Sequence, residues 1–185
     1  TTVAYSQTER YTVRRTPFSS RITDEFSPVL YRDGIVFCSN INDNSLVSYK
    51  DENNRLFKIW YAASRGSGWK QPELLAQELT SGFNDGPATF NRAGNVIFFN
   101  RNNIIGREGK KLNDSTNRLG IFYAFLKNGE WADITAFPYN DPGYVFATPA
   151  LLPDGRRLYF ASDKPGGYGG MDIYYCDSIV TGWSA

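Results

Sequence analysis

The chain has 185 residues, and 20 Lys and Arg against 19 Asp and Glu give it a formal net charge of +1. Most nucleic-acid binders rely on a basic field that a near-neutral chain lacks, so no nucleic-acid partner is predicted. The sequence contains no His, so its own residues exclude Ser-His-Asp and Cys-His catalysis and His-ligated zinc. No run of 18 apolar residues is present, which predicts no direct membrane span by a helix.

The composition favours a protein built from strands. Aromatic residues make up 16% of the chain, with 13 Phe, 12 Tyr and 4 Trp, whereas Met occurs once. Aromatic side chains favour strands, and the 17 Gly and 9 Pro supply turns. With 41% hydrophobic residues the chain has enough apolar surface for a core. We therefore expect an all-β fold of about one domain.

One pattern occurs three times along the chain. Each repeat begins with a Pro-led segment, a turn containing Gly and an aromatic-rich segment, which together are typical of a β-hairpin. The hairpins span residues 27–39, 86–100 and 148–162. A third strand follows each of them, at residues 59–62, 121–124 and 173–176. Ten residues after the Ile that opens each third strand comes a Trp, at Trp69, Trp131 and Trp183. This constant spacing predicts a repeated unit of about four short strands.

In chain order, residues 1–20 come first, and segment 11–17 lies where the fourth strand of a preceding or closing blade is expected. The repeats then predict blades at residues 21–80, 81–142 and 143–185. Fourth strands are expected at 73–79 and near 132–137, and the third blade is expected to lack its own. Because the sequence opens on Thr1 rather than Met, we expect a trimmed piece of a longer protein.

We expect the repeated units to pack face to face as blades of a β-propeller. A four-stranded sheet with two apolar faces needs a neighbour on each side, and radial packing buries both faces. Three blades are too few for a ring, so the predicted fold is a partial propeller of about three four-stranded blades belonging to a larger ring. Segments 40–57 and 101–118 are expected to form loops on one face, which leaves open whether they bind anything.

The third repeat resembles the TolB-type propeller repeat, in the variant found in OmpA-family outer-membrane lipoproteins of Bacteroidota. The match rests on the Pro-Asp-Gly turn at 153–155, Leu-Tyr-Phe-Ala-Ser-Asp at 158–163 and Pro-Gly-Gly-Tyr-Gly-Gly-Met-Asp-Ile-Tyr at 165–174. The first two repeats match in frame, but their turns at 32–34 and 92–94 lack the Pro-Asp pair. The resemblance covers roughly residues 10–185.

This resemblance implies a non-catalytic protein-interaction and scaffold propeller that is periplasmic and outer-membrane associated. A component of the type IX secretion apparatus has a similar layout, with a peptidoglycan-binding OmpA-like domain after its propeller. The implied partners are envelope or secretion-machinery proteins, with peptidoglycan bound only through a domain outside this sequence. No catalytic residue, cofactor or metal is expected. The alternatives are a fragment of a propeller glycoside hydrolase, which would use an acidic pair, and a propeller that gates a fused hydrolase.

Acidic residues precede the first strand of every repeat: Asp24, Glu25, Asp85 and Asp141. The first strand of a propeller blade lines the central channel, so these carboxylates are candidates for a binding ring at the channel mouth. Such a ring would receive a basic peptide or a metal ion. The alternative is that these residues cap turns, which Asp does readily.

Other recurring residues are predicted to be structural. Trp69, Trp131 and Trp183 are expected to pack between blades rather than to stack on sugars or peptides. Pro28, Pro87 and Pro149 are expected to start strands. The turn at 165–170 is predicted to be a tight hairpin rather than a phosphate cradle, and the Asn/Asp clusters at 40–44 and 113–117 are predicted to be solvated loops rather than Ca²⁺ sites.

Two further expectations follow from the placement of the repeats. Cys38 and Cys176 fall in non-adjacent blades and are predicted to be free thiols. An isolated chain would expose aromatic surface at its two ends. A homodimer with six blades is therefore an open alternative, in which segment 11–17 of each copy pairs with strand 173–176 of the other.

Overall fold

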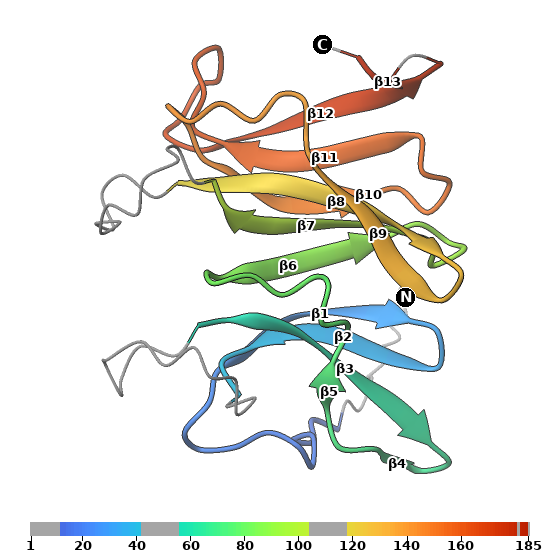
Figure 1. Cartoon of the computed structure of the whole chain (residues 1–185). Coiled ribbons are helices and arrows are strands. Elements are labelled where there is room, and N and C mark those ends of the chain that lie inside the picture. Colours follow the sequence, from blue (N-terminus) through green and yellow to red (C-terminus); the bar gives the residue numbers. More distant parts are fainter. Residues whose placement is uncertain (1–11, 42–55, 104–117, 181, 185) are drawn as a thin grey trace, which may run out of the picture.

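The computed structural model of the chain describes residues 12–41, 56–103, 118–180 and 182–184. Those residues form thirteen strands and no helix. The strands build three antiparallel sheets that stack on one another along the chain (Figure 1). This is the predicted all-β architecture of a partial propeller with three blades. None of the described segments forms a helix with the length and apolar character that a membrane span requires.

Each sheet is a hairpin extended by a third strand and then by one or two outer strands. The first sheet contains β1 (Glu25–Tyr31), β2 (Gly34–Ser39), β3 (Lys58–Arg65), β4 (Gly68–Trp69) and β5 (Glu73–Leu74). The second contains β6 (Asp85–Phe90), β7 (Val96–Asn102), β8 (Leu119–Lys127) and β9 (Glu130–Ala136). The third contains β10 (Phe146–Leu151), β11 (Arg157–Ser162), β12 (Asp172–Ile179) and β13 (Gly182–Trp183). Each sheet lies within one of the ranges 21–80, 81–142 and 143–185 that the repeats delimit.

The outer strands differ from the prediction in length. In the first sheet, the expected fourth strand at 73–79 is reduced to the two residues of β5, which pair with β3. In the second sheet, β9 extends over seven residues and pairs with β8. The third sheet was predicted to lack a fourth strand, yet β13 pairs with Ser178 and Ile179 of β12. The radial arrangement of blades in a propeller leaves only short, protected sheet edges.

The pairing of β7 with β8 is displaced by one residue from the alignment of the three repeats. In the other two sheets, the second and third strands pair as the alignment indicates. The opening Ile residues of the third strands pair in turn with Cys38, Asn100 and Ala161. The alignment had placed Asn100 level with Ser39 and Ser162. A shift of one residue moves a side chain to the opposite face of its sheet. Phe99 and Asn100 therefore point to different sides from those that the alignment indicates.

Each first strand contains a bulge at its proline. The register shifts fall between Phe26 and Val29, between Asp85 and Ala88, and between Ala147 and Ala150. The residues before the prolines, Ser27, Gly86 and Thr148, all have positive φ. Proline has no N–H to donate to a ladder, and a bulge leaves a residue unpaired. Pro28, Pro87 and Pro149 thus lie inside β1, β6 and β10, and the prediction that they start strands is wrong.

Apolar side chains fill both spaces between the sheets. The first core lies between the first and second sheets, and its buried residues are Tyr31, Val36, Ile59, Leu79, Ala88, Ile97, Phe99, Ala124 and Trp131. The second core lies between the second and third sheets, and its buried residues are Phe98, Ile121, Phe137, Phe146, Leu151, Leu158, Phe160 and Cys176. Successive residues of β7 serve the two different cores, because a strand points alternate side chains to opposite faces.

The segment before the first sheet is not the strand that the sequence predicts. Residues 12–24 form no strand, and residue 11 lies outside the described part of the chain. The Phe18 ring stacks on Phe37 with centroids 5.2 Å apart and meets Trp69 edge-on at 5.8 Å. A fourth strand requires a third strand beside it, and no described strand pairs with this segment. The segment instead covers the outer face of the first sheet.

Candidate functional site

Asp85, one of the four predicted channel-mouth carboxylates, is fully buried between the first and second sheets. Its Oδ2 accepts a hydrogen bond from Lys58 Nζ at 2.9 Å, and its Oδ1 accepts one from Arg101 Nε at 2.7 Å. The backbone N–H and the hydroxyl of Ser81 donate to the same carboxylate at 2.8 and 2.9 Å. Lys58 belongs to β3 and Arg101 to β7, so this carboxylate joins two sheets.

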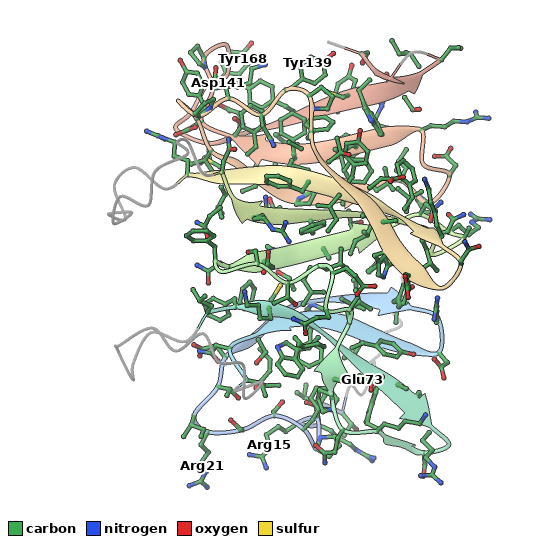
Figure 2. The ribbon with its side chains drawn as sticks, viewed as in Figure 1. Arg15, Arg21, Glu73, Tyr139, Asp141 and Tyr168 are labelled. Carbon is green, nitrogen blue, oxygen red and sulfur yellow. The ribbon has the colours of Figure 1, made fainter. Side chains whose placement is uncertain are left out.

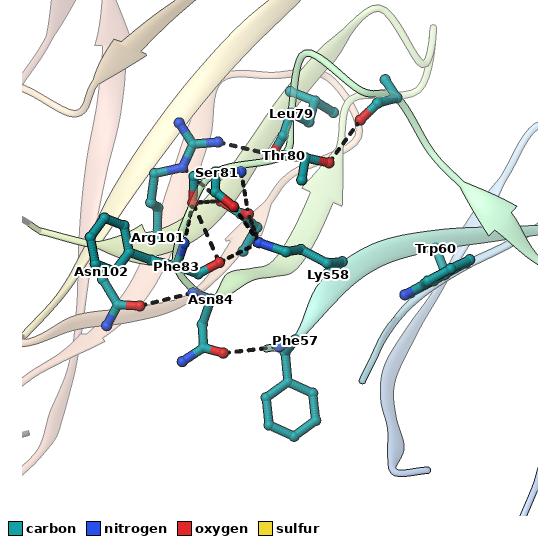
Figure 3. A network of polar contacts seen from close by, with 12 residues as sticks. Phe57, Lys58, Trp60, Leu79, Thr80, Ser81, Phe83, Asn84, Arg101 and Asn102 are labelled. Carbon is teal, nitrogen blue, oxygen red and sulfur yellow. Dashed lines mark hydrogen bonds and ion pairs between the residues drawn. The ribbon is translucent and has the colours of Figure 1, made fainter. Parts of the chain in front are cut away.

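The network around Asp85 satisfies its cations as well (Figure 3). Lys58 Nζ also donates to the carbonyls of Ser81 and Phe83, which uses all three of its N–H groups. Arg101 Nη2 donates to the carbonyl of Leu79 at 2.9 Å. A buried ion pair is tolerated when hydrogen bonds complete its surroundings. Asp85 is therefore structural, and its predicted place in an open binding ring is wrong because Lys58 and Arg101 draw it between the sheets.

The other three carboxylates are more accessible, and those of Glu25 and Asp141 have local partners. Asp141 is exposed, and its Oδ1 accepts a hydrogen bond from the backbone N–H of Gly143 at 2.7 Å, which is a turn-capping contact. Asp24 is exposed and Glu25 is half-buried, with Oε1 of Glu25 accepting from the Thr23 hydroxyl at 2.6 Å. The described residues contain no cluster of three or more His, Cys, Asp or Glu side chains that could hold a metal ion. A binding role for Asp24, Glu25 and Asp141 stays a prediction.

A second polar residue, Asn100, joins the second and third sheets. Its side chain is fully buried. Asn100 Nδ2 donates to the carbonyls of Gly120 and Phe146 at 3.0 and 2.8 Å, and its Oδ1 accepts from the backbone N–H of Thr148 at 2.7 Å. The amide thus reaches both sheets and compensates the ladder bonds lost at the β10 bulge. The sequence offered one overlooked signal for both networks, which is the polar pair Asn100-Arg101 at the end of an otherwise apolar strand.

Two of the three recurring Trp residues pack between sheets, as predicted. Trp131 is 5% exposed in the first core, and the Trp183 ring lies edge-on to Phe98 of the second sheet at 5.5 Å. Trp69 differs, since it is 36% exposed and meets Phe18 rather than another sheet. All three rings lie on the face of their sheet that points toward the preceding part of the chain. In the first sheet this is the face that Phe18 covers, so Trp69 contacts Phe18.

Both cysteines are free and buried, which confirms the prediction for these residues. Burial, together with the nearby charge of Asp85, raises the pKa of the Cys38 thiol to about 12. Burial also raises the pKa of Cys176. Thiols with raised pKa values carry little thiolate at neutral pH and are poor nucleophiles. These cysteines serve as small core residues.

The outer face of the third sheet is open and largely apolar. Ile173, Tyr175 and Ile179 of β12 are exposed on it. Arg157 binds Asp177 through two hydrogen bonds, at 2.6 and 2.9 Å, and its guanidinium lies 4.2 Å from the Tyr175 ring centroid. The hydrogen bonds from Arg157 hold the pKa of Asp177 below its usual value. This ion pair has its polar partners in place before any further molecule binds.

The glycine-rich turn at 165–170 holds a fully exposed Tyr168 at the periphery of the third sheet (Figure 2). The backbone N–H of Gly169 donates to the Asp172 carboxylate, and the Tyr174 hydroxyl donates to the carbonyl of Lys164 at 2.9 Å. No helix follows this turn within the described residues, in agreement with a hairpin connection. The Asn/Asp clusters predicted to be solvated loops fall almost entirely outside the described residues, at 42–44 and 113–117.

Comparison with known proteins adds little. No family model and no curated protein matches the sequence. Among solved structures, a puromycin-hydrolyzing peptidase of Mycobacterium tuberculosis is similar over 83% of this chain at 14% sequence identity, with a TM-score of 0.42. This chain spans 22% of the length of that structure. A similarity at this level assigns no activity.

Proposed function

We propose that this chain is a non-catalytic protein-interaction and scaffold propeller of the bacterial cell envelope. In this proposal it is periplasmic and outer-membrane associated, and it binds envelope or secretion-machinery proteins without a cofactor. The envelope location rests on the resemblance of residues 152–175 to the TolB-type repeat. Attachment to peptidoglycan would belong to a domain outside this sequence.

The observation that carries a binding function is the placement of Tyr168. Tyr, Trp and Arg contribute most of the binding energy at protein interfaces, because they bury a large area at a low entropy cost. A Tyr that is fully exposed has no packing role in its own chain. The turn that carries it is held by the Asp172 carboxylate and by Tyr174, so a partner would meet a side chain on a preorganised backbone.

Site-specific photo-crosslinking in cells tests this proposal. A photoreactive phenylalanine replaces Tyr168 in the full-length protein, and the matched control places it at Asp154, an exposed turn residue at the opposite end of β11. We expect adducts with envelope proteins from position 168 and few from position 154. Equal yields from the two positions, or adducts only with proteins that are not in the envelope, would refute the proposal.

The glycosidase alternative has a separate test. A hydrolase that uses a carboxylate of this chain would lose activity in Asp24→Asn, Glu25→Gln or Asp141→Asn variants of the full-length protein. We expect no glycoside hydrolysis that depends on these residues. A rate on aryl glycosides that falls by orders of magnitude in any of these variants would assign catalysis instead.

A further inference from the structure

The faces that the three sheets turn toward their following neighbour are built alike. The opening Ile of each third strand, and the Tyr two residues later, point to this side. Ile59 is 4% exposed and Ile121 is 0% exposed, because the next sheet covers each of them. Ile173 is 73% exposed, and Tyr175 is exposed beside it. The third sheet thus carries the same side chains that the first two use for packing, but they are uncovered.

At the two interfaces between sheets, equivalent residues cover this face. The covering sheet brings a Trp from its outer strand and a Phe from its second strand. These are Trp131 with Phe99 in the first core and Trp183 with Phe160 in the second. The chemistry that fits Ile173 and Tyr175 is therefore the Trp-bearing face of another sheet of this repeat.

The chain contains one more face of that kind among its described residues. It belongs to the first sheet and contains Phe37 and Trp60, which are 3% and 5% exposed, together with Trp69. Phe18 and the segment around it are its cover, and they leave Trp69 36% exposed, against 5% for Trp131 under a complete sheet. The segment forms no strand and adds no ladder bonds to the sheet.

We propose that the outer face of the third sheet binds the first sheet of a second copy of this chain, and that the Phe18 segment moves aside as it does so. The same contact formed twice, about a twofold axis, joins two chains of three sheets into a ring of six. Propellers close with typically four to eight blades, so six is a permitted number whereas three is not. In such a pair of 185-residue chains, none of the three sheets that the described residues form keeps an uncovered face, which prevents further growth.

The contact joins faces of sheets and needs no exchange of strands. Segment 12–17 is not a strand, so the pairing of residues 11–17 with strand 173–176 that the sequence suggested is not part of this proposal. The charged residues at the rim are compatible with burial, because Arg157 and Asp177 already neutralise each other. Burying this pair adds no unpaired charge to the interface.

Sedimentation velocity over a concentration series tests the proposal on the 185-residue chain. We expect a monomer–dimer equilibrium without larger species. Ile173→Asp should weaken the dimer by about tenfold or more, since an apolar anchor at an interface centre is replaced by a charge. Val180→Asp is the matched control, because Val180 is fully exposed in the turn that follows β12. A wild-type chain that stays monomeric at every concentration, or an Ile173→Asp dimer as strong as the Val180→Asp dimer, would overturn the proposal.

A mixing experiment shows which faces meet. Trp69→Asp damages the face of the first sheet and leaves the third sheet intact, whereas Ile173→Asp does the reverse. At a concentration where the wild type has just become dimeric, each variant alone should be mainly monomeric. An equimolar mixture should form a one-to-one complex through the one interface that remains complete. A Trp69→Asp chain that dimerises as well as the wild type would mean that third sheets bind each other, and this would refute the head-to-tail contact. Circular dichroism of each variant checks that the β fold is retained.

Discussion

Replacing Asp85 by Asn should destabilise the protein strongly although it changes no volume. The substitution removes the negative charge that Lys58 and Arg101 share. The side chains of Lys58 and Arg101 are 8% and 15% exposed, so neither cation regains full hydration. The new amide also presents N–H groups to neighbours that are themselves donors. Removing one partner of a buried ion pair costs about 3–5 kcal/mol, and we expect Asp85→Asn to fall in this range.

Urea unfolding, followed by the fluorescence of the four Trp residues, measures this cost. The control is Asp154→Asn, because Asp154 lies in an exposed turn with Arg156 at 3.9 Å and an Asn there can still cap the turn. That variant should change the free energy of unfolding by less than about 0.5 kcal/mol. A double-mutant cycle with Lys58→Met should show strong coupling between Lys58 and Asp85. If Asp85→Asn is no less stable than Asp154→Asn, the assignment of Asp85 as the link between the sheets is wrong.

Three further predictions use the same assay. Trp131→Ala should lower the free energy of unfolding by about 3–5 kcal/mol because it empties part of the first core. Trp69→Ala should lower it less because the Trp69 ring is partly exposed. Equal losses of stability in the two variants would contradict the packing role of Trp131. Burial raises the folded-state pKa of Cys38 from 9.0 to about 12. The contribution of the protonated thiol to stability is therefore complete below pH 9 and is lost as the pH rises from 9 toward 12, by up to about 1.4 kcal/mol per pH unit. Cys38→Ala should remove this part of the pH dependence, and an unchanged dependence of the free energy of unfolding on pH would argue against burial of the thiol. Gly86→Ala should be destabilising because φ there is +98° and a Cβ would overlap Cys38 Sγ. Cys38→Ala should recover part of the loss but not the backbone strain. A Gly86→Ala variant as stable as the wild type would show that the bulge can rearrange.

The repeated unit and the class of fold follow from the order of the residues alone. The Ile-to-Trp spacing of ten residues sets the length of the third strand and its return, which is local geometry that survives in all three sheets. The free state of Cys38 and Cys176 also followed from the repeats, because two residues in non-adjacent sheets are too far apart for a disulfide. These features depend on strand periodicity and on contacts between neighbours in sequence, and both can be read from the order of the residues.

The contacts of the repeated residues, in contrast, depend on how the three sheets pack. Whether the carboxylate of Asp85 faces solvent or the core depends on Lys58, which is 27 residues earlier in another sheet, and on Arg101 across the ladder. The one-residue shift of Asn100 depends on the hydrogen bonds that its side chain makes to a third sheet. Trp69 and Trp131 occupy the same place in the repeat, yet one is covered by a single Phe and the other by a whole sheet. Burial and charge pairing are properties of the packed neighbours, and a repeat in the sequence does not specify which neighbour each copy will have.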